Sequence, residues 1–133
     1  MVKSITLECE PSWGPYPTSR IHIRKDKRNM GVASLKSKGG SPEIASEIPP
    51  NSSKILSEEM VANLLKQLSR TRIPIYPEFQ MGMDGEWFTL KLEEFGYSAT
   101  YHWWSDCGKW KPIAKIANQI WSIFFREDLR EEY

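Results

Sequence analysis

EWFTLKLEEFGYSATYHWW, residues 86–104, is the stretch that decides the fold. Apolar and polar side chains alternate along both of its halves, and this alternation is the pattern of a β-strand with one buried face. Gly96 lies between the halves and suits a turn. The pattern therefore predicts a hairpin with strands over residues 86–94 and 97–104.

The same alternation assigns each side chain of the hairpin to one of two faces. Phe88, Leu90 and Leu92 share a face of the first strand. In the second strand, the adjacent Trp103 and Trp104 must point to opposite sides. If Trp103 faces the core, Trp104 faces solvent or a partner, unless a helix or a long loop covers it. Because tryptophan is a favoured interface anchor, Trp104 is a candidate contact residue.

Three more strands are predicted upstream of the hairpin. Residues 2–10 and 19–24 alternate clearly and residues 31–36 more weakly, which together indicates an antiparallel meander. Residues 37–53 are rich in Ser, Gly, Pro and Asn. We expect this segment to be a long flexible loop.

Apolar residues at helical spacing predict two helices. The first follows a cap at Ser57 or Ser53 and carries the stripe Val61, Leu64, Leu65 and Leu68. The second begins near Trp110 or Lys111 and carries the stripe Ile113, Ile116, Ala117, Ile120 and Phe124.

The order of these elements is β-β-β-α-β-β-α. The economical arrangement is an antiparallel sheet of about five strands with two amphipathic helices packed on one face. The sequence thus predicts a single α+β domain over residues 1–133, with the flexible loop at 37–53.

Charge and composition limit the function. The chain has 18 Lys and Arg against 17 Asp and Glu, a net charge of +1. This balance argues against a dedicated nucleic-acid binder, which usually has a basic excess. The sequence contains no run of about 18 apolar residues and therefore predicts no membrane-spanning helix. The first residues lack the apolar stretch of a secretory signal, so we expect a cytoplasmic protein.

Motifs of catalysis and metal binding are missing from the sequence. Its two Cys and two His have no zinc-ligand spacing, and it shows no phosphate-binding loop and no nucleophile elbow. We therefore assign no catalytic residue, metal or cofactor. One alternative is a small hydrolase or transferase that uses the carboxylates around the hairpin, or Cys107 with a histidine.

A second alternative is a nucleic-acid-binding module that uses the basic meander. Arg20, His22 and Arg24 line one face of the second predicted strand, although no aromatic residue of that strand joins them in a stacking platform.

Four segments carry a resemblance to a known group of proteins: the helix at 58–68, Met83–Leu90, Tyr101–Trp104 and Trp110–Ile113. In this pattern, residues 55–125 resemble a loose group of small bacterial proteins. Some of that group look like the immunity proteins of toxin systems, including contact-dependent growth inhibition. The resemblance implies a small cytoplasmic protein without enzymatic activity, which binds a cognate toxin and covers its active site or a nearby surface.

The predicted outward tryptophan beside several carboxylates is our candidate contact surface for such a toxin. Acidic groups there would complement a basic cleft on the partner. The expected contact residues are Glu86, Glu93, Glu94, Trp104 and Asp106. The oligomeric state is left open by the sequence.

Overall fold

The computed structural model describes seven segments of the chain: residues 2–11, 18–25, 31–39, 51–72, 86–94, 96–104 and 111–125. Asp106, one of the expected contact residues, lies outside these segments, as do Cys107 and the part of the expected loop at residues 40–50.

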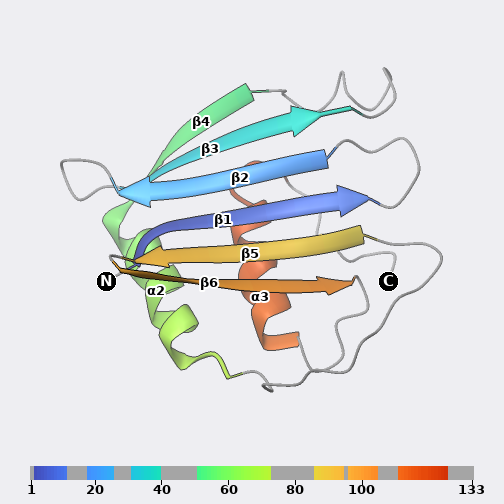
Figure 1. Cartoon of the computed structure of the whole chain (residues 1–133). Helices are drawn as coiled ribbons and strands as arrows, with labels where there is room; N and C mark the ends of the chain where they lie inside the picture. Colours follow the sequence, from blue (N-terminus) through green and yellow to red (C-terminus); the bar gives the residue numbers. More distant parts are fainter. Residues whose placement is uncertain are drawn as a thin grey trace.

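Six strands form one antiparallel sheet in the order β4-β3-β2-β1-β5-β6 (Figure 1). Their bounds are β1 Val2–Pro11, β2 Thr18–Lys25, β3 Gly31–Lys38, β4 Asn51–Leu56, β5 Glu86–Glu94 and β6 Tyr97–Trp104. The two helices are α2 Glu58–Arg70 and α3 Lys111–Trp121. The N-terminal strand β1 lies at the centre, because it pairs with β2 on one side and with β5 on the other.

The α+β class, the hairpin and the two helices are confirmed, but the number of strands differs from our expectation. β4 begins inside the segment predicted as a loop, and β3 extends into that segment as far as Lys38. The sequence of β4 is NSSKIL, and Leu56 is its one buried residue. β4 is held in place by its pairing with β3 and buries little side-chain surface. Its sequence therefore has no alternation of apolar and polar residues that would predict a strand.

Both helices lie on the same side of the sheet, behind the strands in Figure 1. We call the face of the sheet beneath them the inner face. Ser57 caps α2, and its side chain accepts a hydrogen bond from the backbone N–H of Met60 at 3.2 Å. Pro112 lies in the first turn of α3, where its missing N–H costs nothing.

The core lies between the inner face and the two helices. On the strands it is made of side chains that alternate along each one: Ile5, Leu7 and Cys9 on β1, Ile21 and Ile23 on β2, Ala33 and Leu35 on β3, Phe88 and Leu90 on β5, and Trp103 on β6. The helices contribute Val61, Leu64, Ile113, Ala114, Ile116, Ala117 and Ile120. Burial of these apolar surfaces is the main force that stabilises the fold.

Polar contacts fix the helices relative to each other and to β4. The side-chain amides of Gln67 on α2 and Gln119 on α3 exchange two hydrogen bonds of 2.9 and 2.7 Å. Lys54 on β4 donates from Nζ to the carbonyl oxygen of Ile123 at 2.8 Å, just beyond the last turn of α3. An ammonium group there is favoured by the negative end of the helix dipole.

Candidate binding surface on the outer face of the sheet

The face of the sheet opposite α2 and α3, which we call the outer face, turns toward the viewer in Figure 1. The strand registers place one set of alternating side chains on it. These are Thr6, Glu8 and Glu10 on β1, Arg20, His22 and Arg24 on β2, Val32, Ser34, Lys36 and Lys38 on β3, Trp87, Thr89, Lys91 and Glu93 on β5, and Thr100, His102 and Trp104 on β6.

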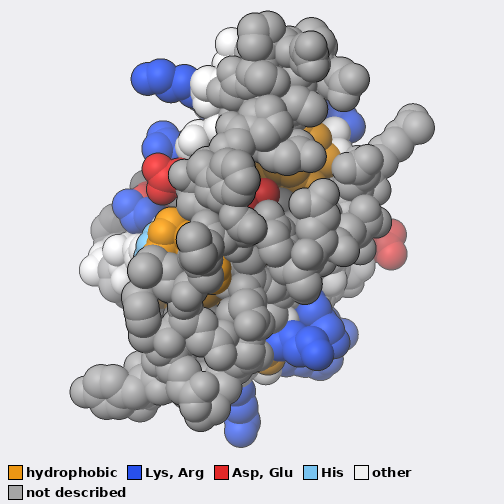
Figure 2. All heavy atoms as spheres, turned by 90° about the vertical axis from the view of Figure 1, so that its right-hand side faces the viewer, with side chains coloured by type: hydrophobic (Ala, Val, Ile, Leu, Met, Phe, Trp, Pro, Cys, Tyr) orange, Lys and Arg blue, Asp and Glu red, His pale blue; other side chains and the backbone are white. Residues whose placement is uncertain are grey.

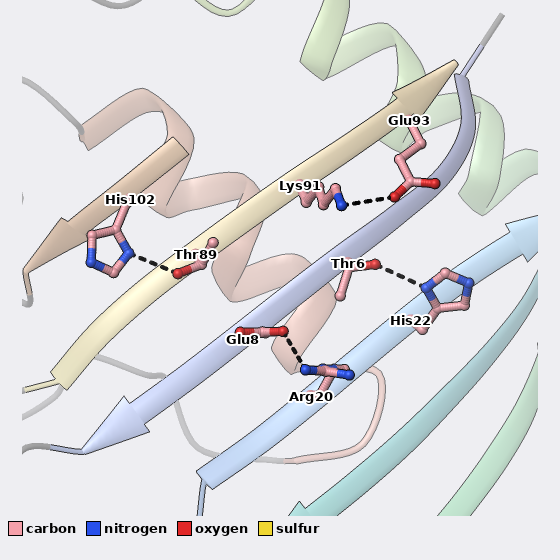
Figure 3. Close-up of polar contacts among 8 residues, drawn as sticks. All are labelled: Thr6, Glu8, Arg20, His22, Thr89, Lys91, Glu93 and His102. Atoms are coloured by element: carbon pink, nitrogen blue, oxygen red, sulfur yellow. Dashed lines mark hydrogen bonds and ion pairs between the residues drawn. The ribbon is translucent and has the colours of Figure 1, made fainter. Parts of the chain in front are cut away.

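Two threonine–histidine pairs hold side chains of the outer face in place (Figure 3). Thr6 Oγ1 is hydrogen-bonded to Nδ1 of His22 at 2.9 Å, and Thr89 Oγ1 to Nδ1 of His102 at 2.8 Å. In each pair the partners are directly opposite each other on neighbouring strands. Because both bonds use Nδ1, they fix the imidazole rings and leave Nε2 as the nitrogen that can reach a ligand.

Two ion pairs lie on the same face. Arg20 Nη2 is 2.8 Å from Glu8 Oε1, and Lys91 Nζ is 3.1 Å from Glu93 Oε1 (Figure 3). All four side chains are between 40% and 60% exposed. Such exposed pairs add little to stability, but they neutralise two of the carboxylates on this face.

Positive charge is concentrated on one half of the sheet. Strands β2, β3 and β4 contain six Lys and Arg and no Asp or Glu, whereas β1, β5 and β6 contain two Lys and five Glu. Within the described segments, Arg24, Lys36 and Lys38 form no ion pair. Figure 2, where the outer face is on the left, shows Lys and Arg side chains along its upper part, above hydrophobic and histidine side chains.

An aromatic cluster lies on the other half of the outer face. The rings of Trp87 and His102 are stacked, with centroids 4.4 Å apart and planes 7° from parallel. Trp104 packs edge-on against Trp87, with centroids 5.1 Å apart. His102 is exposed and Trp87 partly exposed. The cluster therefore presents an aromatic ring at the surface.

The basic residues of β2 and this aromatic cluster share one face of the sheet. The sequence analysis did not predict this, because it looked for aromatic residues only within the second strand. The cause is the pairing of β1 with both β2 and β5, which joins the two regions into a single sheet. A signal was present in the sequence: when both helices pack on one face of a single sheet, the polar sides of all strands must lie on the other face.

The expected acidic contact residues are distributed over both faces. Glu93 lies on the outer face, whereas alternation with Phe88, Leu90 and Leu92 places Glu86 and Glu94 on the inner side at opposite ends of β5. At ~3.4 Å per residue, these two ends are about 27 Å apart. The structure therefore does not bring the three carboxylates together.

Trp104 is on the outer face, as alternation predicts, and of the two alternatives that the sequence left open, exposed or covered, the structure shows the covered one. It is only 5% exposed, and the Trp87 ring packs against it. Trp87 and His102 present the accessible aromatic surface in its place, and we had not chosen either as a contact residue.

The described residues offer few of the thiol and carboxylate groups that the alternative function, a small hydrolase or transferase, would need. Cys9 is buried, and this burial, followed by the charges of Glu86 and Glu8, raises the pKa of its thiol, which disfavours the nucleophilic thiolate. A hollow of about 260 Å³ beside α2 and α3 has one carboxylate in its described lining, that of Glu59. The described residues contain no group of three or more His, Cys, Asp or Glu that could hold a metal ion.

Comparisons of the chain with protein-family models, curated proteins and solved structures found no match. Within the described segments, neither helix has the length and apolar character needed to cross a bilayer.

Proposed function

We propose that this protein is a non-enzymatic binding domain of the immunity-protein type, which acts in the cytoplasm and neutralises a cognate bacterial toxin. The observation that supports this proposal best is the outer face itself. It combines fixed polar side chains, cations without an ion-pair partner among the described residues and an accessible aromatic ring, on the side of the sheet that neither helix covers.

The composition of this face suits a protein partner. Tryptophan and arginine are the residues most enriched at the energetic centres of protein interfaces, and Trp87 and Arg20 lie on this face. The Thr–His bonds restrict side chains before binding, which reduces the entropy lost on association.

The charge distribution suggests an anionic docking surface on the partner. We expected an acidic patch around the hairpin, but the residues gathered in the structure are the cations of β2 and β3. A partner that presents carboxylates to this half would be steered toward it, and its association rate would fall as salt is added.

The test is co-expression with the protein encoded by the adjacent open reading frame in the source bacterium. We expect that protein to be toxic alone, and this chain to form a complex with it and restore growth. A Lys36→Glu/Lys38→Glu variant should protect less well. The matched control is Lys66→Glu/Lys115→Glu, which reverses two exposed lysines on the helices. A harmless neighbour, or rescue without complex formation, would contradict the proposal.

A further inference from the structure

We infer that the outer face also binds single-stranded RNA, with phosphates on the basic half and a base stacked on the aromatic cluster. This inference shares the proposed binding surface, but it does not depend on the existence of a toxin partner.

The phosphate contacts come from Arg24 on β2 and from Lys36 and Lys38 on β3. Lys36 and Lys38 lie two residues apart on β3, about 7 Å, whereas Arg24 is opposite Val32, about 14 Å along the sheet from Lys36. None of the three forms an ion pair with a described residue. Of the three described carboxylates on this face, two, Glu8 and Glu93, are already paired with Arg20 and Lys91. The three remaining cations are therefore available to replace the counterions of a nucleic-acid backbone.

The stacking contact comes from His102. Its ring is stacked on Trp87 on one side and is exposed to solvent, while Thr89 holds Nδ1 in the ring plane. The free side of a ring fixed in this way can continue the stack with any base, because every base has a π face. A duplex cannot use this contact, since its bases are stacked inside the helix.

Lys36 and His102 lie at the two ends of one row across the sheet, with the Arg20–Glu8 ion pair and Thr89 between them, and hydroxyl groups lie in a neighbouring row. Thr6, Ser34 and Thr100 are on the outer face in one row with His22 and with Lys91, which lies between Thr6 and Thr100. Nε2 of His22 is directed away from the bond to Thr6 (Figure 3). From β3 to β6 the row spans four strand spacings, about 19 Å. Hydroxyl and imidazole groups can hydrogen-bond a ribose 2′-OH, the group by which proteins distinguish RNA from DNA. This is why we assign RNA.

The experiment is fluorescence anisotropy with a labelled single-stranded RNA of mixed sequence, about twelve nucleotides long. DNA of the same sequence and the corresponding RNA duplex are measured beside it, in about 50 and 200 mM salt. We expect the single-stranded RNA to bind most tightly. Equal affinity for DNA would overturn the assignment of RNA, and a duplex bound as tightly as the single strand would overturn the stacking contact.

Charge variants test the basic half. Lys36→Glu/Lys38→Glu should weaken RNA binding tenfold or more at the lower salt concentration. It should also make the slope of log affinity against log salt concentration less steep by about 1.4, because two phosphate contacts are lost. Lys66→Glu/Lys115→Glu changes net charge by the same amount on the helices and should bind like the wild type. An equal loss in both variants would show that net charge alone is responsible, and would refute the site.

Ring variants test the stacking contact. His102→Ala should weaken binding about fivefold or more, whereas His102→Tyr, which keeps an aromatic ring, should retain it. Far-UV circular dichroism establishes that each variant is folded. If wild-type protein binds no RNA but still rescues cells from the toxin, this inference fails and the proposed function stands. If the protein binds RNA but has no toxin partner, the proposed function fails and this inference stands.

Discussion

The two faces of the sheet obey different physical rules, although their residues alternate along the same strands. On the inner face, side chains such as Leu7 and Leu90 are fully buried and exchange only packing contacts. On the outer face, side chains such as Thr89 and Arg20 meet one neighbour each through a hydrogen bond or ion pair. The inner face therefore carries most of the stability, and the outer face can change its chemistry without unfolding the protein. The four predictions below test this separation.

The largest difference is expected between neighbours in β5. Leu90→Ala removes a fully buried side chain and should lower the free energy of unfolding by about 2–5 kcal/mol. Thr89→Ala removes an exposed hydrogen bond to His102 and should cost less than about 1 kcal/mol. Urea denaturation of both variants measures the difference. Similar losses would mean that the outer face contributes to folding as much as the core does.

The next prediction concerns the contact between β3 and α2. A Cβ atom at Gly31 would overlap Cγ2 of Val61, a β-branched side chain that cannot easily turn away. Gly31→Ala should therefore cost about 1–3 kcal/mol. In a Val61→Ala background the same change should cost much less, so a double-mutant cycle separates the overlap from other effects. If the losses in the free energy of unfolding from the two substitutions simply add, overlap with Val61 is not the cause.

A third prediction uses pH to probe the inner face. Burial raises the pKa of Cys9, so the folded thiol stays protonated where an unfolded thiol, with a pKa of about 8.5, ionises. The folded state then binds more protons, and its stability falls as pH rises above that value. The stability advantage of wild type over Cys9→Ala should shrink by about 1 kcal/mol between pH 7 and pH 9.5. A constant difference in denaturation experiments would show that Cys9 does not titrate differently in the two states.

The smallest effect is expected for the ion pair of Glu8 and Arg20. Both side chains are substantially exposed, so the coupling free energy from the cycle of Glu8→Gln and Arg20→Gln should stay below about 1 kcal/mol. It should also decrease in high salt. A larger coupling that resists salt would show that the outer face contributes to stability through its charges.

Local patterns were sufficient to predict much of the fold. The hairpin strands, their faces and the cap at Ser57 follow from alternation, turn residues and capping preference within a few positions of the chain. These features depend on neighbours in sequence, and a single sequence contains them. β4 was missed because its residues NSSKIL carry no such pattern and depend on β3 for their conformation.

The candidate site could be predicted only in part, because it depends on how distant strands pair. Arg20, His22 and Arg24 were correctly grouped on one face of β2, but their neighbours across β1 were not identified. Trp87 and His102 join them through the pairing of Leu7 with Leu90, which no local spacing specifies. Whether Trp104 is exposed or covered stayed open for a similar reason, since the Trp87 ring that packs against it comes from a different strand.

The central position of β1 also has a consequence for synthesis on the ribosome. β1 is made before its partner β5, and β2, β3, β4 and α2 are made between them. During that interval the edge of β1 that pairs with β5 lacks this partner, and such an edge can pair with another chain. We therefore expect the nascent protein to be vulnerable to aggregation until residue 94 has left the ribosome, and we expect this long-range pairing to slow folding.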